Sequence, residues 1–187
     1  MFDGSVRRGL FVGRFQPLHV GHVEVIKSLL EKLDELVIVI GSSQKSHELD
    51  NPFTSGERIM MLRTALNDAK VDSARYYLIP IPDVQDHSTW VSQVISHSPP
   101  FKIVYSNEAL TRRLFKEAGV RVENIPFINR GNYSSTEVRR RMLADEDWRT
   151  LLPKCVSEII IKIGGVQRLK ELATTDSPFK KNALSSS

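Results

Sequence analysis

Short apolar runs alternate along the chain with longer segments whose apolar residues recur every three to four positions. The first pattern is typical of buried strands, and the second is typical of helices that pack on a sheet. The pattern predicts strands at Gly9–Val12, Leu36–Ile40, Tyr76–Ile81, Lys102–Tyr105 and Arg121–Phe127. It predicts helices at Val20–Lys32, Ser55–Asp68, Thr89–His97, Ala109–Ala118, Ser135–Ala144, Val156–Ile163 and, after Gly164-Gly165, Val166–Leu172.

This alternation predicts an α/β fold with a Rossmann-like, doubly wound parallel sheet in a single domain. A chain of 187 residues is long enough to bury its own core. We expect an N-terminal arm at 1–6, the folded domain at 7–173 and a C-terminal tail at 174–187. The tail is polar, rich in serine and lysine, and lacks a repeated apolar face, so it is expected to be disordered.

The composition is that of an ordinary globular protein, with 41% apolar and 26% charged residues. The single cysteine, Cys155, excludes an internal disulfide framework and a cysteine-based zinc cluster, and it favours a reducing compartment. No apolar run approaches the roughly 18 residues of a membrane span, and no long apolar segment resembles a secretory signal. We therefore expect a cytoplasmic protein without a membrane partner.

The net charge of +4 is mild, although it leaves open a basic protein that binds nucleic acid. The arginines fall in short clusters, notably Arg139-Arg140-Arg141, rather than in one long run. Such clusters suit a small polyanion at least as well, so we expect no nucleic-acid partner.

The segment from Gly13 to His22 carries the most chemical information. It follows the first predicted strand and begins a helix, and free N–H groups and the helix dipole at such a start attract anions. His19 and His22 share one helical face, and Gly21 between them leaves bare backbone that a flat ring or a phosphate can approach. The segment predicts a polyphosphate cradle with two imidazole donors. The alternatives are zinc ligands, for which no third ligand is nearby, and plain residues of a helix start.

Further polar and aromatic residues follow the other predicted strands. In an open α/β sheet, ligands bind beyond the carboxyl ends of the strands, so these residues are expected to converge. They are Gly41-Ser42-Ser43-Gln44, Pro82–Asp86 with Trp90, Ser106-Asn107, Arg130 and Tyr133–Thr136.

The start of the helix at Ser135 is a second candidate phosphate site. Ser134, Ser135 and Thr136 supply hydroxyls beside free N–H groups, and Arg139 lies one turn further on the same face. The simpler interpretation is an ordinary capped helix, with Ser134 or Ser135 as the N-cap.

Two of these motifs resemble a known family. The run His19-Val20-Gly21-His22, introduced by Gly-Arg-Phe-Gln-Pro, resembles the His-x-Gly-His signature of nucleotidyltransferases. About 110 residues later, the segment from Ser134 to Arg139 resembles the Ser-Ser/Thr-x-x-Arg motif of the same family. From Arg8 to Leu172 the chain is similar to the archaeal type of nicotinamide-mononucleotide (NMN) adenylyltransferase.

This resemblance implies transfer of the adenylyl group of ATP to NMN, which gives NAD and pyrophosphate. The phosphate of NMN is already an anion, so the reaction needs alignment and charge stabilisation rather than a general base. Mg²⁺ is expected to arrive with ATP, ligated by phosphates and water, without metal ligands from the protein. The resemblance also implies a homo-oligomer, a hexamer. The sibling alternatives act on FMN, pantetheine phosphate or a cytidylyl substrate, and a non-catalytic nucleotide sensor is a further alternative.

The resemblance assigns residues to three roles. The expected catalytic residues are His19, His22, Arg14 and Arg139. The expected ATP-binding residues are Gly13, Arg14, Phe15, His19, Gly21, His22, Ser106, Asn107, Arg130, Ser134, Ser135, Thr136 and Arg139. The expected NMN-binding residues are Gln16, Ser42, Asp83 and Trp90.

Trp90 has two interpretations. A tryptophan is more often part of a core than of a binding site. The resemblance instead implies that the indole stacks on the pyridinium ring of NMN, a cation–π contact, because Trp90 follows Asp83 by seven residues. His87 lies between Asp86 and Trp90 and is expected near the site, whereas His47 and His97 are assigned no role.

Overall fold

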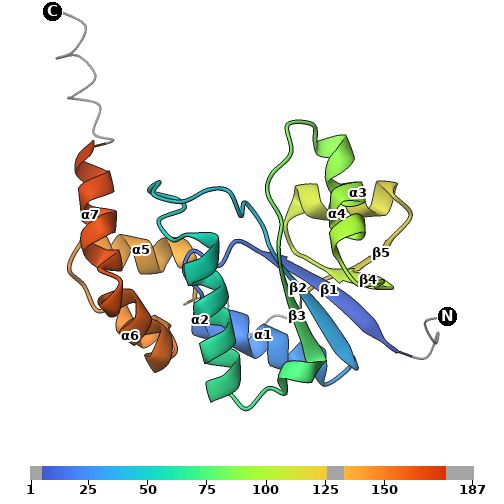
Figure 1. Cartoon of the computed structure of the whole chain (residues 1–187), viewed down its shortest axis with the longest axis horizontal. Helices are drawn as coiled ribbons and strands as arrows, with labels where there is room; N and C mark the ends of the chain where they lie inside the picture. Colours follow the sequence, from blue (N-terminus) through green and yellow to red (C-terminus); the bar gives the residue numbers. More distant parts are fainter. Residues whose placement is uncertain (1–5, 126–132, 176–187) are drawn as a thin grey trace, which may run out of the picture.

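The computed structural model describes residues 6–125 and 133–175, so the expected site residue Arg130 and the predicted strand end Phe127 lie outside the described residues. Within these described residues, five parallel strands form one sheet in the order β3-β2-β1-β4-β5 (Figure 1). The strands are β1 (Arg8–Gly13), β2 (Glu35–Ile40), β3 (Tyr76–Pro80), β4 (Ile103–Tyr105) and β5 (Arg121–Glu123). The strand order reverses direction between β1 and β4, which confirms the predicted doubly wound sheet and marks its switch point.

Each predicted helix is present, one with the expected ends and the others with ends that differ by up to three residues. The helices are α1 (Val20–Leu30), α2 (Ser55–Asp68), α3 (His87–His97), α4 (Ala109–Glu117), α5 (Ser135–Leu143), α6 (Lys154–Lys162) and α7 (Gly165–Thr175). Helix α7 includes Thr174 and Thr175, so the helix extends past the expected start of the tail. Two short 3₁₀ turns, at Ser73–Arg75 and Arg149–Leu151, were not predicted because three residues are too few to show a period.

Two separate cores lie on the two faces of the sheet. Successive side chains of a strand point to opposite faces, so Leu10 and Val39 pack with Phe115 beneath α3 and α4. Phe11 and Ile38 instead join the larger core beneath the other helices. Both faces of the central strands are therefore covered, which is why their sequences read as continuous apolar runs.

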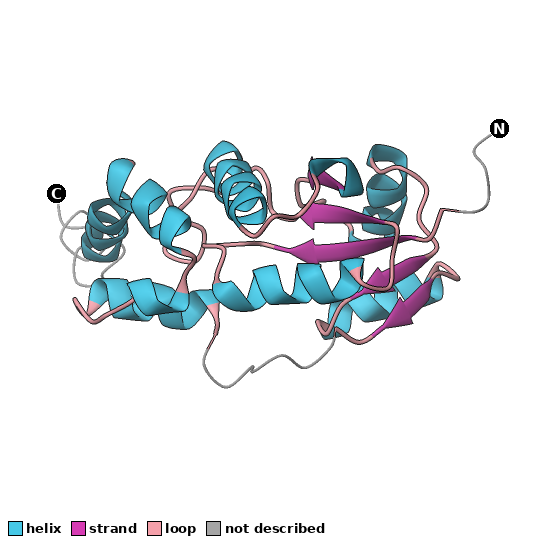
Figure 2. Cartoon of the chain, turned by 90° about the horizontal axis from the view of Figure 1, so that it is seen from below, coloured by secondary structure: helices cyan, strands magenta, loops and turns pink. Residues whose placement is uncertain are grey.

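The three C-terminal helices gather beyond the carboxyl ends of the strands (Figure 2). Helix α7 is tied to α2 by Arg168, which bonds both carboxylate oxygens of Glu57 and the Pro52 carbonyl. Helix α5 begins beside the loop after β1, where the Ser135 hydroxyl donates to the Pro17 carbonyl at 2.9 Å. This contact joins segments 118 residues apart in the sequence and brings the two predicted phosphate motifs together.

Candidate active site

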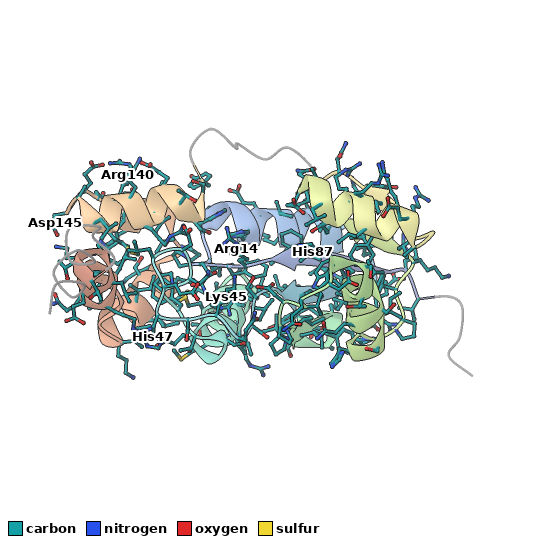
Figure 3. The ribbon with its side chains drawn as sticks, turned by 90° about the horizontal axis from the view of Figure 1, so that it is seen from above. Arg14, Lys45, His47, His87, Arg140 and Asp145 are labelled. Carbon is teal, nitrogen blue, oxygen red and sulfur yellow. The ribbon has the colours of Figure 1, made fainter. Side chains whose placement is uncertain are left out.

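Two cavities open side by side at the carboxyl edge of the sheet. The first, of about 570 Å³, is bounded by the loop after β1, the loop after β4 and the starts of α1 and α5. The second, of about 380 Å³, is bounded by the loops after β1, β2 and β3 and by α3 and α4. Both cavities are lined by Val12, Arg14, Ser106 and Glu108. A ligand in one cavity can therefore meet a ligand in the other beside Arg14. Figure 3 shows Arg14 and His87 near the middle of the molecule.

The two histidines form a stacked pair at the start of α1. His19 is the N-cap residue, and its ring lies 3.6 Å from the ring of His22, with an angle of 22° between their planes. The backbone N–H of His19 donates to Nδ1 of His22 at 3.2 Å. In the neutral ring of His22 the proton is therefore assigned to Nε2, which leaves that nitrogen as a donor.

Burial keeps both imidazoles uncharged at neutral pH. It lowers the pKa of His19 to about 4. Burial, and then the neighbouring His19, hold the pKa of His22 well below its ordinary value. In residues 6–125 and 133–175, no group of three histidine, cysteine or acidic side chains lies where it could hold a metal ion, so the zinc interpretation finds no third ligand there. The pair instead suits hydrogen bonding to anionic oxygens.

Close packing shapes the loop before the histidines. A Cβ atom on Gly13 would lie 2.7 Å from Cζ of Phe15, whose ring is buried and meets His22 edge-on at 4.9 Å. A Cβ on Gly21 would lie 3.2 Å from both His19 Nδ1 and Tyr133 Cβ. Gly21 lines the first cavity as expected, but the close approach that it permits is used by the protein's own side chains.

The start of α5 combines the two interpretations that the sequence left open. Ser134 is the N-cap, and its hydroxyl accepts the backbone N–H of Glu137 at 3.0 Å. Ser134, Ser135 and Thr136 also line the first cavity. The segment is therefore a capped helix whose N-terminus forms part of the cavity wall.

Only one arginine of the triplet at 139–141 lines the first cavity. Arg139 is buried, and its guanidinium donates to the Gln16 carbonyl at 2.8 Å and to Oδ1 of Asp50 at 2.7 Å. Arg140 is exposed and bonds Glu137 and Glu146 on the outer face of α5. The structure thus separates the two arginines by their surroundings, and the one in the cavity wall is Arg139, the arginine that the motif selects.

The structure places Gln16 apart from the other three residues expected to bind NMN. Its side-chain amide donates to the Phe53 carbonyl at 2.8 Å and accepts the Phe53 N–H at 3.0 Å. The residue is buried in the wall of the first cavity rather than the second. Because both ends of the amide are used, Gln16 anchors its loop to the segment before α2. The side-chain amide of Asn107 is also used at both ends, because it donates to the Ile125 carbonyl and accepts the Ile125 N–H.

Ser42, Asp83 and Trp90 come together in the second cavity. The Ser42 hydroxyl donates to Oδ1 of Asp83 at 2.9 Å, and Gln44 donates to Oδ2 at 3.3 Å, so the carboxylate is held in one orientation. Trp90 lies in the cavity wall and also meets Phe115 edge-on at 5.6 Å. Trp90 therefore has both a core contact and a surface in the cavity wall.

Sequence reasoning missed several residues of the second cavity. Glu108 lies between the two cavities, and its carboxylate caps α4 by accepting the N–H of Leu110 at 2.9 Å. Leu110 and Leu114 add apolar side chains to the cavity wall, and His87 lines the cavity as its place before Trp90 suggested. The available signal for Glu108 was its position directly after Ser106-Asn107 at the end of β4.

The chain belongs to the cytidylyltransferase-like family, whose model matches residues 10–141. It is 49% identical to the nicotinamide-nucleotide adenylyltransferase of Methanolobus tindarius over 175 residues, which cover 94% of this chain and 99% of that protein. It is 48% identical to the protein of the same name from Archaeoglobus fulgidus, over 90% of this chain and 99% of that protein. Within the larger family, the chain groups with the archaeal nicotinamide-nucleotide adenylyltransferases, which confirms the resemblance found in its motifs.

A solved structure supports the fold. A bifunctional NMN adenylyltransferase/ADP-ribose pyrophosphatase from Francisella tularensis, in complex with AMP and a manganese ion, matches with a TM-score of 0.76 at 21% identity. The match covers 97% of this chain but only 56% of that protein. Among the described residues, no helix is both long and apolar enough to cross a membrane.

Proposed function

We propose that the protein transfers the adenylyl group of ATP to NMN and thereby makes NAD. The observation that carries this proposal is the meeting of two unlike cavities at Arg14. One is walled by two helix N-termini, two imidazoles and Arg139, and the other by an aromatic ring and an oriented carboxylate. The named relatives, at about half identity over nearly the whole chain, support the same activity.

In this proposal the first cavity holds the triphosphate of ATP. Nε2 of His22, the ring of His19 and the guanidinium of Arg14 face the α- and β-phosphates, while the start of α5 and Arg139 face the β- and γ-phosphates. A phosphate oxygen of NMN attacks the α-phosphorus, the bond from that phosphorus to the bridging oxygen breaks, and pyrophosphate leaves. The neutral imidazoles donate hydrogen bonds as charge grows on the leaving group, so no side chain has to accept a proton.

The second cavity holds the nicotinamide end of NMN. Trp90 offers its indole face to the cationic ring, and Asp83, held by Ser42, offers a carboxylate nearby. Both features favour a positively charged, flat acceptor. FMN and pantetheine phosphate lack a pyridinium ring, so this cavity favours NMN over the acceptors of the sibling enzymes.

We propose Mg²⁺ as the metal, entering as its ATP complex. The donors available for it are mostly phosphate oxygens and water, because the described residues offer no cluster of three acidic or histidine ligands. Bound there, the ion would neutralise charge on the phosphates during transfer. We further propose that the protein works in the cytoplasm as a homo-oligomer, a hexamer, which sedimentation of the purified protein would test.

The deciding experiment is to incubate the purified protein with ATP, MgCl₂ and NMN and to follow NAD and pyrophosphate by mass spectrometry. Parallel reactions contain FMN or pantetheine phosphate in place of NMN. Formation of NAD in the reaction with NMN, and of no product in the parallel reactions, supports the proposal. A product with FMN or pantetheine phosphate would identify a sibling transferase, and ATP binding without any product would identify a nucleotide sensor.

A further inference from the structure

A fully buried arginine lies beneath the loops that form the two cavities. Arg58, in the first turn of α2, has an exposed fraction of 0%. One of its terminal nitrogens donates to the carbonyls of Arg14 and Gly41, both at 2.9 Å, and the other donates to the carbonyl of Ser42 at 3.1 Å. Its Nε donates to the Thr54 carbonyl at 3.3 Å. Arg58 therefore joins the loop after β1 to the loop after β2.

The charge of Arg58 is costly where it lies. Within the described parts of the chain, its hydrogen-bond acceptors are carbonyl oxygens and no carboxylate is among them. Burial lowers the pKa of the guanidinium to about 10, while Asp83 opposes that change. The side chain still carries its charge at neutral pH. A buried charge without a paired carboxylate destabilises a fold unless hydrogen bonds compensate for the lost hydration. The four bonds to carbonyl oxygens are therefore what stabilise the charge of Arg58 in this position.

The backbone next to these carbonyls is strained. Phe15 has a φ of 52° and Ser42 a φ of 49°, values that non-glycine residues seldom adopt. Each residue directly follows a carbonyl bonded by Arg58, that of Arg14 or that of Gly41. In a planar trans peptide the N–H points opposite to the C=O. The N–H groups of Phe15 and Ser42 are therefore directed away from Arg58.

We propose that Arg58 is a positioning residue for adenylyl transfer, holding the two strained loops in the conformation that both substrates need. This inference rests on the proposed function. Through the first loop Arg58 sets the place of Arg14, where the cavities meet, and through the second it sets the place of Ser42, which orients Asp83. One buried guanidinium thereby aligns the ATP side of the site with the acceptor side.

The chain contains a matched control for this role. Arg75 also uses its guanidinium to bind backbone carbonyls, those of Leu30, Leu33 and Asp34. These carbonyls lie just before the amino end of β2, at the opposite edge of the sheet from the cavities. Arg75 is only partly buried, whereas Arg58 is fully buried. A role in stability alone therefore predicts lower melting temperatures but normal turnover of the folded protein for both arginines, whereas a positioning role predicts loss of turnover only at Arg58.

The experiment compares full-length wild-type protein with Arg58→Lys, Arg58→Gln and Arg75→Lys. Thermal unfolding gives the folded fraction, and steady-state NAD formation gives kcat and both KM values well below the unfolding temperature. A lysine ammonium is one compact donor and cannot span three carbonyls on two loops. We expect Arg58→Lys to lower kcat of the folded enzyme by about 10- to 100-fold, the range of lost charge-assisted hydrogen bonds. Arg58→Gln should lose as much, and Arg75→Lys should stay within about twofold.

Each outcome decides the matter. A folded Arg58 variant with kcat within threefold of wild type overturns the inference, as do equal losses at Arg58 and Arg75. If neither Arg58 variant folds while Arg75→Lys does, Arg58 is a folding residue and the inference is also overturned. Failure of the wild-type protein to make NAD is a different result, because it rejects the proposed function itself.

Discussion

The two cavities that meet at Arg14 are built in different ways. The first is formed largely by two continuous stretches, the loop that leads from β1 into α1 and the start of α5. The second is formed by single side chains from several loops and helices. A polyphosphate can be bound by backbone N–H groups and helix dipoles, which a short contiguous motif supplies. A flat organic cation needs an aromatic face and a carboxylate, which distant segments must bring together.

The cavities also differ in how they treat charge. Arg14 and Glu108 line both cavities, and to these the first cavity adds two uncharged histidines and the guanidinium of Arg139. The second cavity adds the carboxylate of Asp83, which pairs with Lys45 at 3.5 Å, beside an apolar wall. This contrast predicts that substitutions in one cavity change the use of one substrate, and the following predictions test that separation.

The largest effect is expected for His19→Ala and His22→Ala. Each ring is proposed to bond the phosphates more tightly in the transition state than in the ground state, as donors of an oxyanion hole do. Alanine should therefore lower kcat by about 10²–10³, while KM for ATP changes less. Steady-state kinetics with varied ATP measure both. The control is His97→Ala, at the exposed end of α3. Loss of ATP affinity with an unchanged kcat would contradict the catalytic role.

Substitution of Trp90 should act on the other substrate. Stacking on an aromatic ring is worth about 1–3 kcal/mol, so Trp90→Ala should raise KM for NMN by about 5- to 150-fold. KM for ATP should change little, and Trp90→Phe should be intermediate.

Because Trp90 also contacts Phe115, thermal unfolding must be measured on the same variants. The control is Trp148→Phe, a change at a buried tryptophan outside both cavities. A destabilised Trp90→Ala protein with an unchanged ratio of the two KM values would show that the indole is only part of the core.

A smaller effect is expected for Arg139→Lys. Lysine cannot keep the contacts with Gln16 and Asp50 and also present a planar fork to two phosphate oxygens. Loss of about one charge-assisted hydrogen bond should lower kcat/KM for ATP by about tenfold. Arg140→Lys, on the outer face of α5, is the matched control and should have little effect. Equal, mild losses in both variants would mean that the phosphate clamp has been assigned to the wrong arginine.

The smallest effect concerns pH and the ligand-free protein. In the unfolded chain each histidine titrates near 6.5, whereas the pKa of His19 in the fold is about 4. As the pH falls from about 6.5 toward 4, the unfolded state takes up protons that the folded state does not, so the free energy of unfolding decreases over this window.

The melting temperature should therefore fall by several degrees more in wild type than in a His19→Asn variant across that range, since about 1 kcal/mol shifts it by roughly 2–4 °C at this size. ATP should reduce the fall, because its phosphates favour a protonated imidazole. If the melting temperatures of wild type and His19→Asn changed equally with pH, protonation of His19 would not account for the loss of stability.

Much of the fold could be predicted from the chain because its elements are long and well punctuated. Helix α2 begins and ends at the predicted residues, since Thr54 and Glu57 form a capping box before an amphipathic run. The boundary of α7 was less accurate, because Thr174 and Thr175 are poor helix formers that nevertheless continue the helix to its end.

The site was predicted in part. The histidine pair and the start of α5 could be located because each is a local motif that begins a helix. Gln16 was expected to bind NMN but lines the first cavity, apart from Ser42, Asp83 and Trp90. Nothing in its neighbours along the chain reveals that its amide pairs with Phe53, 37 residues away. Arg58 was not assigned because it bonds loops distant in the sequence. Glu108 was not assigned because its local contact, a cap of α4, does not reveal that it borders both cavities.

By itself the sequence determined the order of strands and helices, the two phosphate motifs and the family to which the chain belongs. These depend on periodicity, caps and short motifs, which are local interactions between residues close along the chain. Only the tertiary structure decided which residues complete the second cavity and which buried side chain joins the loops of the two cavities. Burial and hydrogen bonding between distant loops set those choices, and such contacts leave no local pattern for the sequence to display.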